Sequence, residues 1–121
     1  MIDSAADLDV IASKVSPQMA SALRGAVAQE GFASDMGAQV VHMFANVWAR
    51  PGMGARDRSL ITVAMLVALR QTEELRPHAK LALTNGVTRE ELEELVIHAS
   101  AYAGFPASLS AKAAITDALG G

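Results

Sequence analysis

Two pairs of side chains in this sequence have the types and the spacing for proton transfer. In the first, Glu74 and His78 are four residues apart, so on a regular helix they would be neighbours on one face. A carboxylate beside an imidazole can fix the imidazole tautomer and keep its pKa in the range needed to move a proton at neutral pH. The alternative is an exposed helix pair that contributes little.

The second pair is His98 and Tyr102, which have the same spacing. They continue a stripe that includes Glu91 and Glu94. The alternative is a partly buried histidine and tyrosine whose polar ends bind backbone groups. The remaining candidate of this kind, His42, lies beside an apolar stripe, and we expect a core or subunit-contact histidine there.

Three arginines lie close together in the sequence around a Pro-Gly turn, at Arg50, Arg56 and Arg58. Two guanidinium groups held near each other can bind a carboxylate through paired hydrogen bonds. The alternative is a basic turn that only contacts solvent. The cluster is therefore a candidate anion site.

The residue types and motifs that are missing exclude several kinds of chemistry. The sequence has no cysteine, which excludes disulfides, thiolate nucleophiles and cysteine-ligated zinc. It has three histidines but no HExxH or HxH spacing, so we expect no metal site. The GxGxxG, GxxxxGK(S/T) and GxSxG motifs are also missing, so neither a nucleotide cofactor nor serine-hydrolase chemistry is expected.

The length and composition indicate one helical domain that associates with copies of itself. A chain of 121 residues has the usual length of a single domain, predicted here over residues 1–121. Hydrophobic residues make up 51% and charged residues 19%, which is more apolar than a small monomer needs. The excess is carried by Ala, Leu, Val and Met rather than aromatics, which favours packed helices.

Charge and hydropathy give expectations about partners and location. The net charge of −3 provides no general attraction to nucleic acid or to an anionic membrane. The first fifteen residues lack a basic cluster ahead of an apolar stretch, so they do not resemble a signal peptide. The longest strongly apolar run, Ser59 to Leu69, has eleven residues, whereas a membrane span needs about 20. We therefore expect a cytoplasmic protein.

The periodicity of apolar residues and the capping signals predict only helices. The expected segments are Ser4 to Val15, Pro17 to Gly31, Ser34 to Trp48, Ala55 to Arg70, Glu73 to Thr84, Thr88 to Gly104 and Ala107 to Leu119.

Three of the expected helices have distinctive features. Residues 55–70 are apolar on every side, which predicts a central helix buried all round. In the next helix, Pro77 removes a backbone donor, so its regular part is expected to begin only near Arg76. Thr88 and Glu91 form a T-x-x-E capping box, which predicts a well-defined helix start.

Five ordered segments resemble the signature of the carboxymuconolactone decarboxylase family, and the resemblance is strongest over residues 48–107. Residues 1–31 do not match the usual N-terminal stretch of the family. The five segments are Trp48-Ala-Arg-Pro-Gly-Met53, Arg56-Asp-Arg-Ser-Leu-Ile-Thr-Val-Ala64, Glu74-Leu-Arg-Pro-His78, Leu83-Thr-Asn-Gly-Val-Thr-Arg-Glu-Glu91 and Ala101-Tyr-Ala-Gly-Phe-Pro-Ala107.

The resemblance implies an all-α alkylhydroperoxidase D-like domain of about six helices, assembled as a homotrimer or homohexamer with sites near subunit contacts. The peroxidase branch of this fold carries a CxxC motif, whose positions correspond here to Gln71 and Glu74. Because neither residue is a thiol, peroxidase activity is not expected. A carboxylate, Glu74, stands in the place of the second cysteine.

The resemblance also implies a reaction, the cofactor-free decarboxylation of 4-carboxymuconolactone in aromatic catabolism. There the leaving carboxylate delivers its electrons through the ring to the lactone carbonyl, and a carbon atom is then protonated. On this interpretation Arg50 and Arg58 bind the dianion. His98 or Tyr102 stabilises the oxyanion, and His78, oriented by Glu74, supplies the proton.

Two other functions fit the same residues. The same residues could act on a different small acid or lactone by decarboxylation, isomerisation or ring opening. Alternatively, the chain could be an oligomeric binding protein without catalysis. The divergent N-terminal stretch, Ala55 at a position where arginine is common, and Pro77 between Arg76 and His78 are the departures that bear on the choice of substrate.

Overall fold

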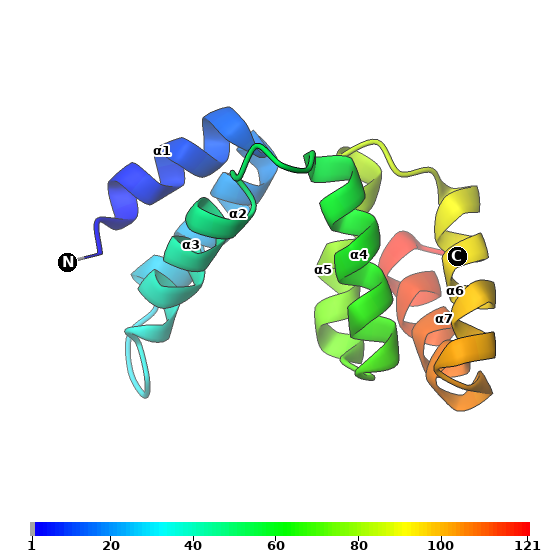
Figure 1. Cartoon of the computed structure of the whole chain (residues 1–121). Helices are drawn as coiled ribbons and strands as arrows, with labels where there is room; N and C mark the ends of the chain where they lie inside the picture. The colour runs from blue at the N-terminus through cyan, green and yellow to red at the C-terminus, as the bar shows by residue number, and fades with distance from the viewer. Residues whose placement is uncertain (1) are drawn as a thin grey trace. The chain divides into compact units, whose positions relative to one another are not determined.

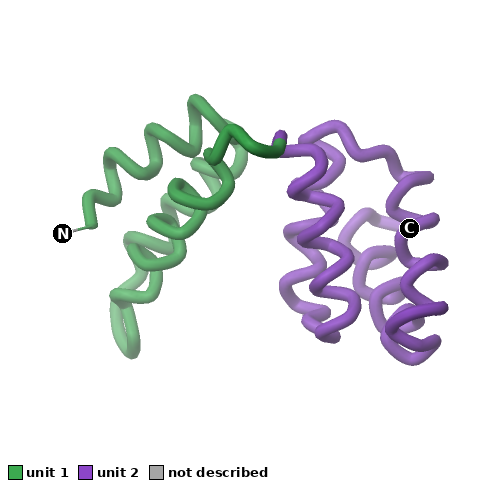
Figure 2. The backbone as a smooth tube through the Cα atoms, viewed as in Figure 1, with its two compact units in different colours: residues 1–53 green, residues 54–121 purple. Residues whose placement is uncertain are grey.

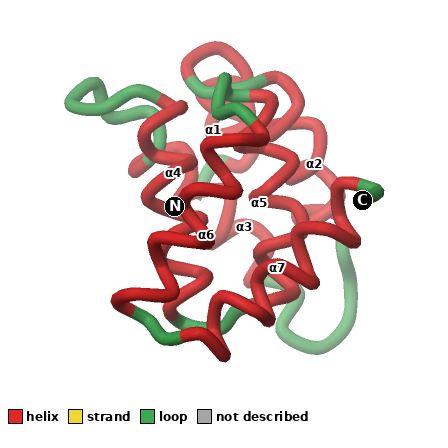
Figure 3. Tube along the Cα trace, turned by 90° about the vertical axis from the view of Figure 1, so that its right-hand side faces the viewer, coloured by secondary structure: helices red, strands yellow, loops and turns green. Residues whose placement is uncertain are grey.

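The chain folds entirely into helices over the residues that the structure describes. A computed structural model describes residues 2–121, which form seven helices and no strand within that range. Figure 3 shows that only turns and loops join these helices. The backbone forms two compact units, residues 1–53 and 54–121 (Figure 2). The predicted all-α class is confirmed.

The first unit contains α1 (Ser4–Lys14), α2 (Pro17–Ala28) and α3 (Met36–Val47), which all contact one another (Figure 1). Side-chain caps begin the first two helices. Asp3 accepts a hydrogen bond from the Ala6 amide at 3.1 Å, and Ser16 accepts one from the Met19 amide at 3.2 Å. These bonds satisfy backbone donors that have no partner within the helix.

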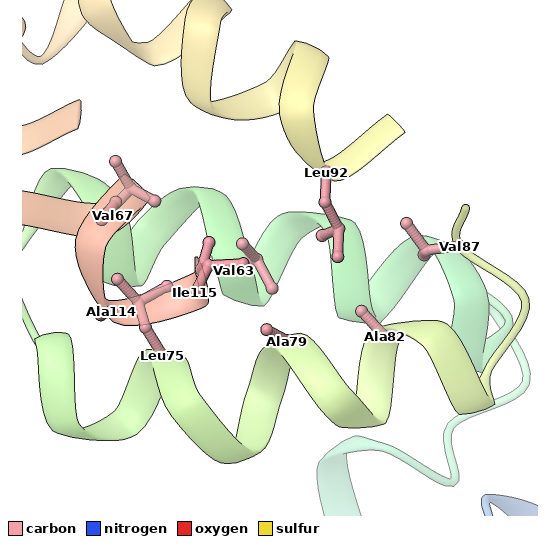
Figure 4. Packing of buried hydrophobic residues seen from close by; sticks show 10 residues of the cluster. Val63, Val67, Leu75, Ala79, Ala82, Val87, Leu92, Ala114 and Ile115 are labelled. Carbon is pink, nitrogen blue, oxygen red and sulfur yellow. The ribbon is translucent and has the colours of Figure 1, made fainter. Parts of the chain in front are cut away.

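The second unit contains α4 (Ala55–Ala68), α5 (Thr72–Thr84), α6 (Arg89–Tyr102) and α7 (Phe105–Leu119). Helices α5 and α7 contact each other most extensively, and α4 contacts the other three. Figure 4 shows side chains from all four helices pointing toward one another. Small residues such as Ala79 and Ala82 on α5 have no exposed surface, so they let the helices approach closely.

Helix α4 is buried on one face only, so the prediction of burial all round is wrong. Val63 and Val67 have no exposed surface, because α5, α6 and α7 pack against this side. In contrast, Ile61, Met65 and Leu69 are 39%, 58% and 67% exposed. The apolar residues on one face of α4 are therefore part of the core of the unit. Those on the opposite face form an exposed apolar surface.

Helix α5 is regular from its first turn, so the prediction that it begins near Arg76 is wrong. The Leu75 amide donates to the Gln71 carbonyl at 3.0 Å, ahead of Pro77. Proline removes a single hydrogen bond, the one to the carbonyl of Glu73, and Glu73 is an exposed residue whose carbonyl can bind water.

A glycine turn and a capping box form the connection from α5 to α6. Gly86 has a φ of 99°, which glycine adopts without strain, and the Val87 amide closes the helix end on the Ala82 carbonyl at 2.9 Å. The predicted capping box is present. The Thr88 amide donates a hydrogen bond to the Glu91 carboxylate, and the Glu91 amide donates one to the Thr88 hydroxyl, both at 3.0 Å. Both ends of this short connection are thus fixed by local hydrogen bonds.

The end of α4 carries a residue in a conformation that glycine prefers. Arg70 has a φ of 57°, and the Gln71 amide donates to the Leu66 carbonyl at 2.9 Å in the pattern of a left-handed helix cap. We expect Arg70→Gly to raise the free energy of unfolding by about 0.5–1 kcal/mol. Glycine removes the steric strain of the left-handed conformation. Part of this stabilisation is offset, because glycine also increases the conformational entropy of the unfolded chain. Urea unfolding at neutral pH measures the change.

Arg70→Ala is the matched control for this substitution. Alanine removes the same side chain but keeps the Cβ atom that makes the left-handed conformation unfavourable. Stabilisation by alanine equal to that by glycine would show that side-chain loss, and not the backbone, explains the effect.

Candidate active site

The structure brings Glu74 and His78 together on one flank of α5. Glu74 is exposed and His78 is half-buried. Burial lowers the pKa of His78 below its ordinary value of 6.5, while the carboxylate of Glu74 acts in the opposite direction. The imidazole is therefore neutral at pH 7 and is electrostatically coupled to a carboxylate one helical turn away.

This flank of α5 lies beside α4. Asn85 follows His78 by two helical turns and so shares its flank. The Asn85 side chain donates to the Ser59 hydroxyl of α4 at 3.0 Å, and Ser59 is only 1% exposed. This partly buried hydrogen bond fixes the position of α5 along α4.

Arg58 lies on the flank of α4 that faces away from α6. It is half-buried and one turn ahead of Thr62, whose hydroxyl donates to the Arg58 carbonyl at 2.8 Å. Helical periodicity puts Arg58 and Thr62 on the flank of α4 opposite Leu60 and Ala64, which face α6. The second unit thus presents a guanidinium and an imidazole from its two adjacent helices α4 and α5.

His98 and Tyr102 lie elsewhere, in a groove between α4 and α6 with a volume of about 1110 Å³. Their ring centroids are 5.1 Å apart, and Tyr102 is 83% exposed. The alternative of a partly buried pair is therefore wrong. The groove has an apolar floor and three carboxylates, those of Glu90, Glu91 and Glu94, along its lining.

Arg56 is held by an ion pair with Glu91, which joins the first turns of α4 and α6. The hydrogen bond to Glu91 raises the pKa of Arg56. The pKa of Glu91 is lowered, first by its bond to the Thr88 amide and then by the bond to Arg56. Arg56 is therefore engaged in holding α4 and α6 together.

The first unit contains the other two candidates from the sequence. Arg50 is exposed in the turn after α3, where its amide donates to the Val47 carbonyl at 3.2 Å. His42 is exposed as well, so it is not a core histidine. Its Nδ1 atom lies 2.9 Å from a carboxylate oxygen of Asp7. No spacing rule connects residues 35 positions apart, so the sequence did not reveal this pair.

Residues 2–121 offer neither a metal-binding cluster nor a membrane-spanning helix. Within this range, no group of three or more histidine, aspartate or glutamate side chains could hold a metal ion. None of the helices described over the same range is long and apolar enough to cross a membrane.

Comparison with known proteins decides the family. The family model described as "Carboxymuconolactone decarboxylase family" matches residues 34–117, which is more than half of the chain. The chain belongs to this family. The match includes α4 to α6 and hence Arg58, Glu74 and His78, and the resemblance inferred from the five sequence segments is confirmed.

Two curated proteins are similar to this chain, each over 65 residues. A 4-carboxymuconolactone decarboxylase of Acinetobacter baylyi is 52% identical, over 54% of this chain and 48% of its own length. A nitrosuccinic acid decarboxylase of Metarhizium robertsii is 40% identical, over 54% of this chain and 46% of its own length. The chain spans about half the length of the curated relatives it matches.

The electrostatics of the Glu74 and His78 pair can be tested by nuclear magnetic resonance. In the wild-type protein we expect His78 to titrate below pH 6.5, since burial disfavours its charged form. Glu74→Gln should lower this pKa further, because the substitution removes the carboxylate that favours the imidazolium. The pH dependence of the imidazole carbon-bound proton shifts measures both values.

Glu73→Gln is the control for this titration, since Glu73 is equally exposed on α5 but does not influence the pKa of His78. A His78 pKa that stays unchanged in Glu74→Gln, or moves as far in Glu73→Gln, would contradict the coupling.

Proposed function

We propose that this chain catalyses the cofactor-independent decarboxylation of a small carboxylic acid at a centre formed by Arg58, Glu74 and His78. The observation that carries the proposal is a half-buried imidazole, that of His78, whose pKa is lowered by burial and which is coupled to the carboxylate of Glu74. Family membership and two relatives named as decarboxylases support it.

The names of the two relatives indicate a common substrate chemistry. In 4-carboxymuconolactone, the electron pair left by CO₂ can move through the ring double bond to the lactone carbonyl. In nitrosuccinic acid, the pair left by the carboxylate beside the nitro group can move onto the nitro oxygens. The substrate itself accepts the electrons in both cases, so no cofactor is needed. We propose an acid of this class, with 4-carboxymuconolactone first among the candidates.

The reaction needs the anion to be held and a carbon atom to be protonated. Arg58 binds a carboxylate of the substrate through charge-assisted hydrogen bonds. The carbon–carbon bond then breaks, CO₂ leaves and its bonding electrons move onto the acceptor oxygens. They return to form a carbon–hydrogen bond with the proton of His78.

The lowered pKa of His78 suits this step once the substrate is bound. A neutral imidazole takes up a proton when an anion binds beside it, because the negative charge favours the imidazolium. The same burial makes that imidazolium a stronger acid toward carbon. After protonating the product, His78 regains its proton from solvent, and Glu74 keeps the ring oriented.

The groove between α4 and α6 is less suited to this substrate. Glu90 and Glu94 line it, and their carboxylates repel a bound anion. The oxyanion role that the family resemblance implies for His98 and Tyr102 therefore lies outside the proposed centre.

The proposal includes assembly into a homotrimer or homohexamer. Ile61 and Met65 on α4 and Leu69 directly after it are exposed apolar side chains at helical spacing, and exposed apolar surfaces often mark contacts with a partner. Light scattering of the purified protein gives the mass directly, and a monomer at micromolar concentration would contradict the assembly.

The test of the proposed function uses His78→Ala with 4-carboxymuconolactone and nitrosuccinate as separate substrates. We expect the wild-type protein to release CO₂ from at least one of them. Loss of the proton donor should lower kcat by roughly 100-fold or more, with helicity unchanged by circular dichroism. His42→Ala is the control, because it removes an exposed histidine of the first unit.

Three other results separate the alternatives. Loss of turnover in His98→Ala but not in His78→Ala would place the reacting centre in the α4/α6 groove. If the protein instead converts another acid or lactone, and His78→Ala loses that activity, the proposed centre is supported but the proposed substrate is wrong. No turnover with saturable binding of these acids would identify a binding protein.

A further inference from the structure

A second groove lies on the opposite flank of α6 from the first, where α6 packs beside α7. It has a volume of about 330 Å³. Its walls are apolar and come from both helices, namely Leu92, Val96, Ile115 and Leu119. Leu92 and Ile115 are buried and belong to the core of the unit, so these walls are held in place by packing on the other side. The groove is thus preformed and of a size that fits a small molecule.

The polar groups on this groove are mainly cationic. Arg89 and Lys112 line it together with one carboxylate, Glu93, and the hydroxyl of Thr116. Arg89 is engaged by Glu93 at 3.6 Å and by the Gly121 carbonyl. Lys112 is exposed and has no ion-pair partner among residues 2–121. One ammonium group is therefore available at the edge of an apolar groove.

The two grooves on α6 have opposite charge. The α4/α6 groove is lined by three carboxylates and no cation, whereas the α6/α7 groove has two cations and one carboxylate. The net positive lining is found on a chain whose overall charge is −3. An anion is thus attracted to the α6/α7 groove and repelled from its neighbour. A single excess charge matches a ligand with one negative group.

We propose that the α6/α7 groove binds a monocarboxylic acid with an apolar body, such as a medium-chain fatty acid. The carboxylate lies at Lys112, within reach of the Thr116 hydroxyl one helical turn further on. The apolar body lies along Val96, Ile115 and Leu119, where it is removed from water. The site uses none of the groups assigned to decarboxylation, so it stands independently of the proposed function.

Octanoate is the probe for this site, used with the full chain. We expect saturable binding by isothermal titration calorimetry, with amide shifts confined to α6 and α7. Lys112→Ala should raise the Kd for octanoate by roughly fivefold, because it removes a charge-assisted hydrogen bond at a solvent-exposed edge. Lys80→Ala is the matched control, since Lys80 is an exposed lysine on α5 that lines neither groove.

Octanamide separates charge recognition from apolar burial. It has the same chain without the charge, so we expect it to bind the wild-type protein more weakly than octanoate does. We also expect octanamide to bind Lys112→Ala with the same Kd as it binds the wild-type protein. Shifts confined to α4 and α5, equal octanoate affinity in wild type and Lys112→Ala, or no saturable binding would each overturn the proposal. Because Lys112 is exposed, its substitution is not expected to unfold the chain.

Discussion

The second unit depends on the burial of one face of α4 against α5, α6 and α7. Val63 and Val67 lose all contact with water on this face, which stabilises the unit through the hydrophobic effect. Because α4 contacts all three other helices, burying this face also fixes its two flanks. One flank then carries Leu60 and Ala64 in the groove toward α6, and Arg58 lies on the flank away from it.

Polar contacts set the position of the helices along this apolar face. The hydrophobic effect is non-directional, so apolar packing alone tolerates small shifts along a helix axis. The hydrogen bond from Asn85 to Ser59 and the ion pair between Arg56 and Glu91 are directional, and both join α4 to the region where α5 ends and α6 begins. Glu91 also closes the capping box, so one carboxylate fixes a helix start and a contact between helices.

The packing of the four helices places charged groups of opposite sign on different surfaces of the second unit. His78 loses hydration at the α4/α5 side, which favours its neutral form. The carboxylates of α6 are concentrated on the flank toward α4, and its cation Arg89 lies on the flank toward α7. Three surfaces of one four-helix unit therefore differ in charge, because each helix shows different residues to each neighbour.

The sequence by itself determined the features that depend on neighbouring residues. Helix types, the capping box at Thr88 and the turn at Gly86 follow from local hydrogen bonds and backbone preferences, and the missing cysteine excluded thiol chemistry outright. Only the tertiary structure decided that α4 is exposed on one face and that Arg56 binds Glu91. It also separated His98 from His78. Periodicity shows which residues share a face, whereas packing between distant segments decides what that face meets.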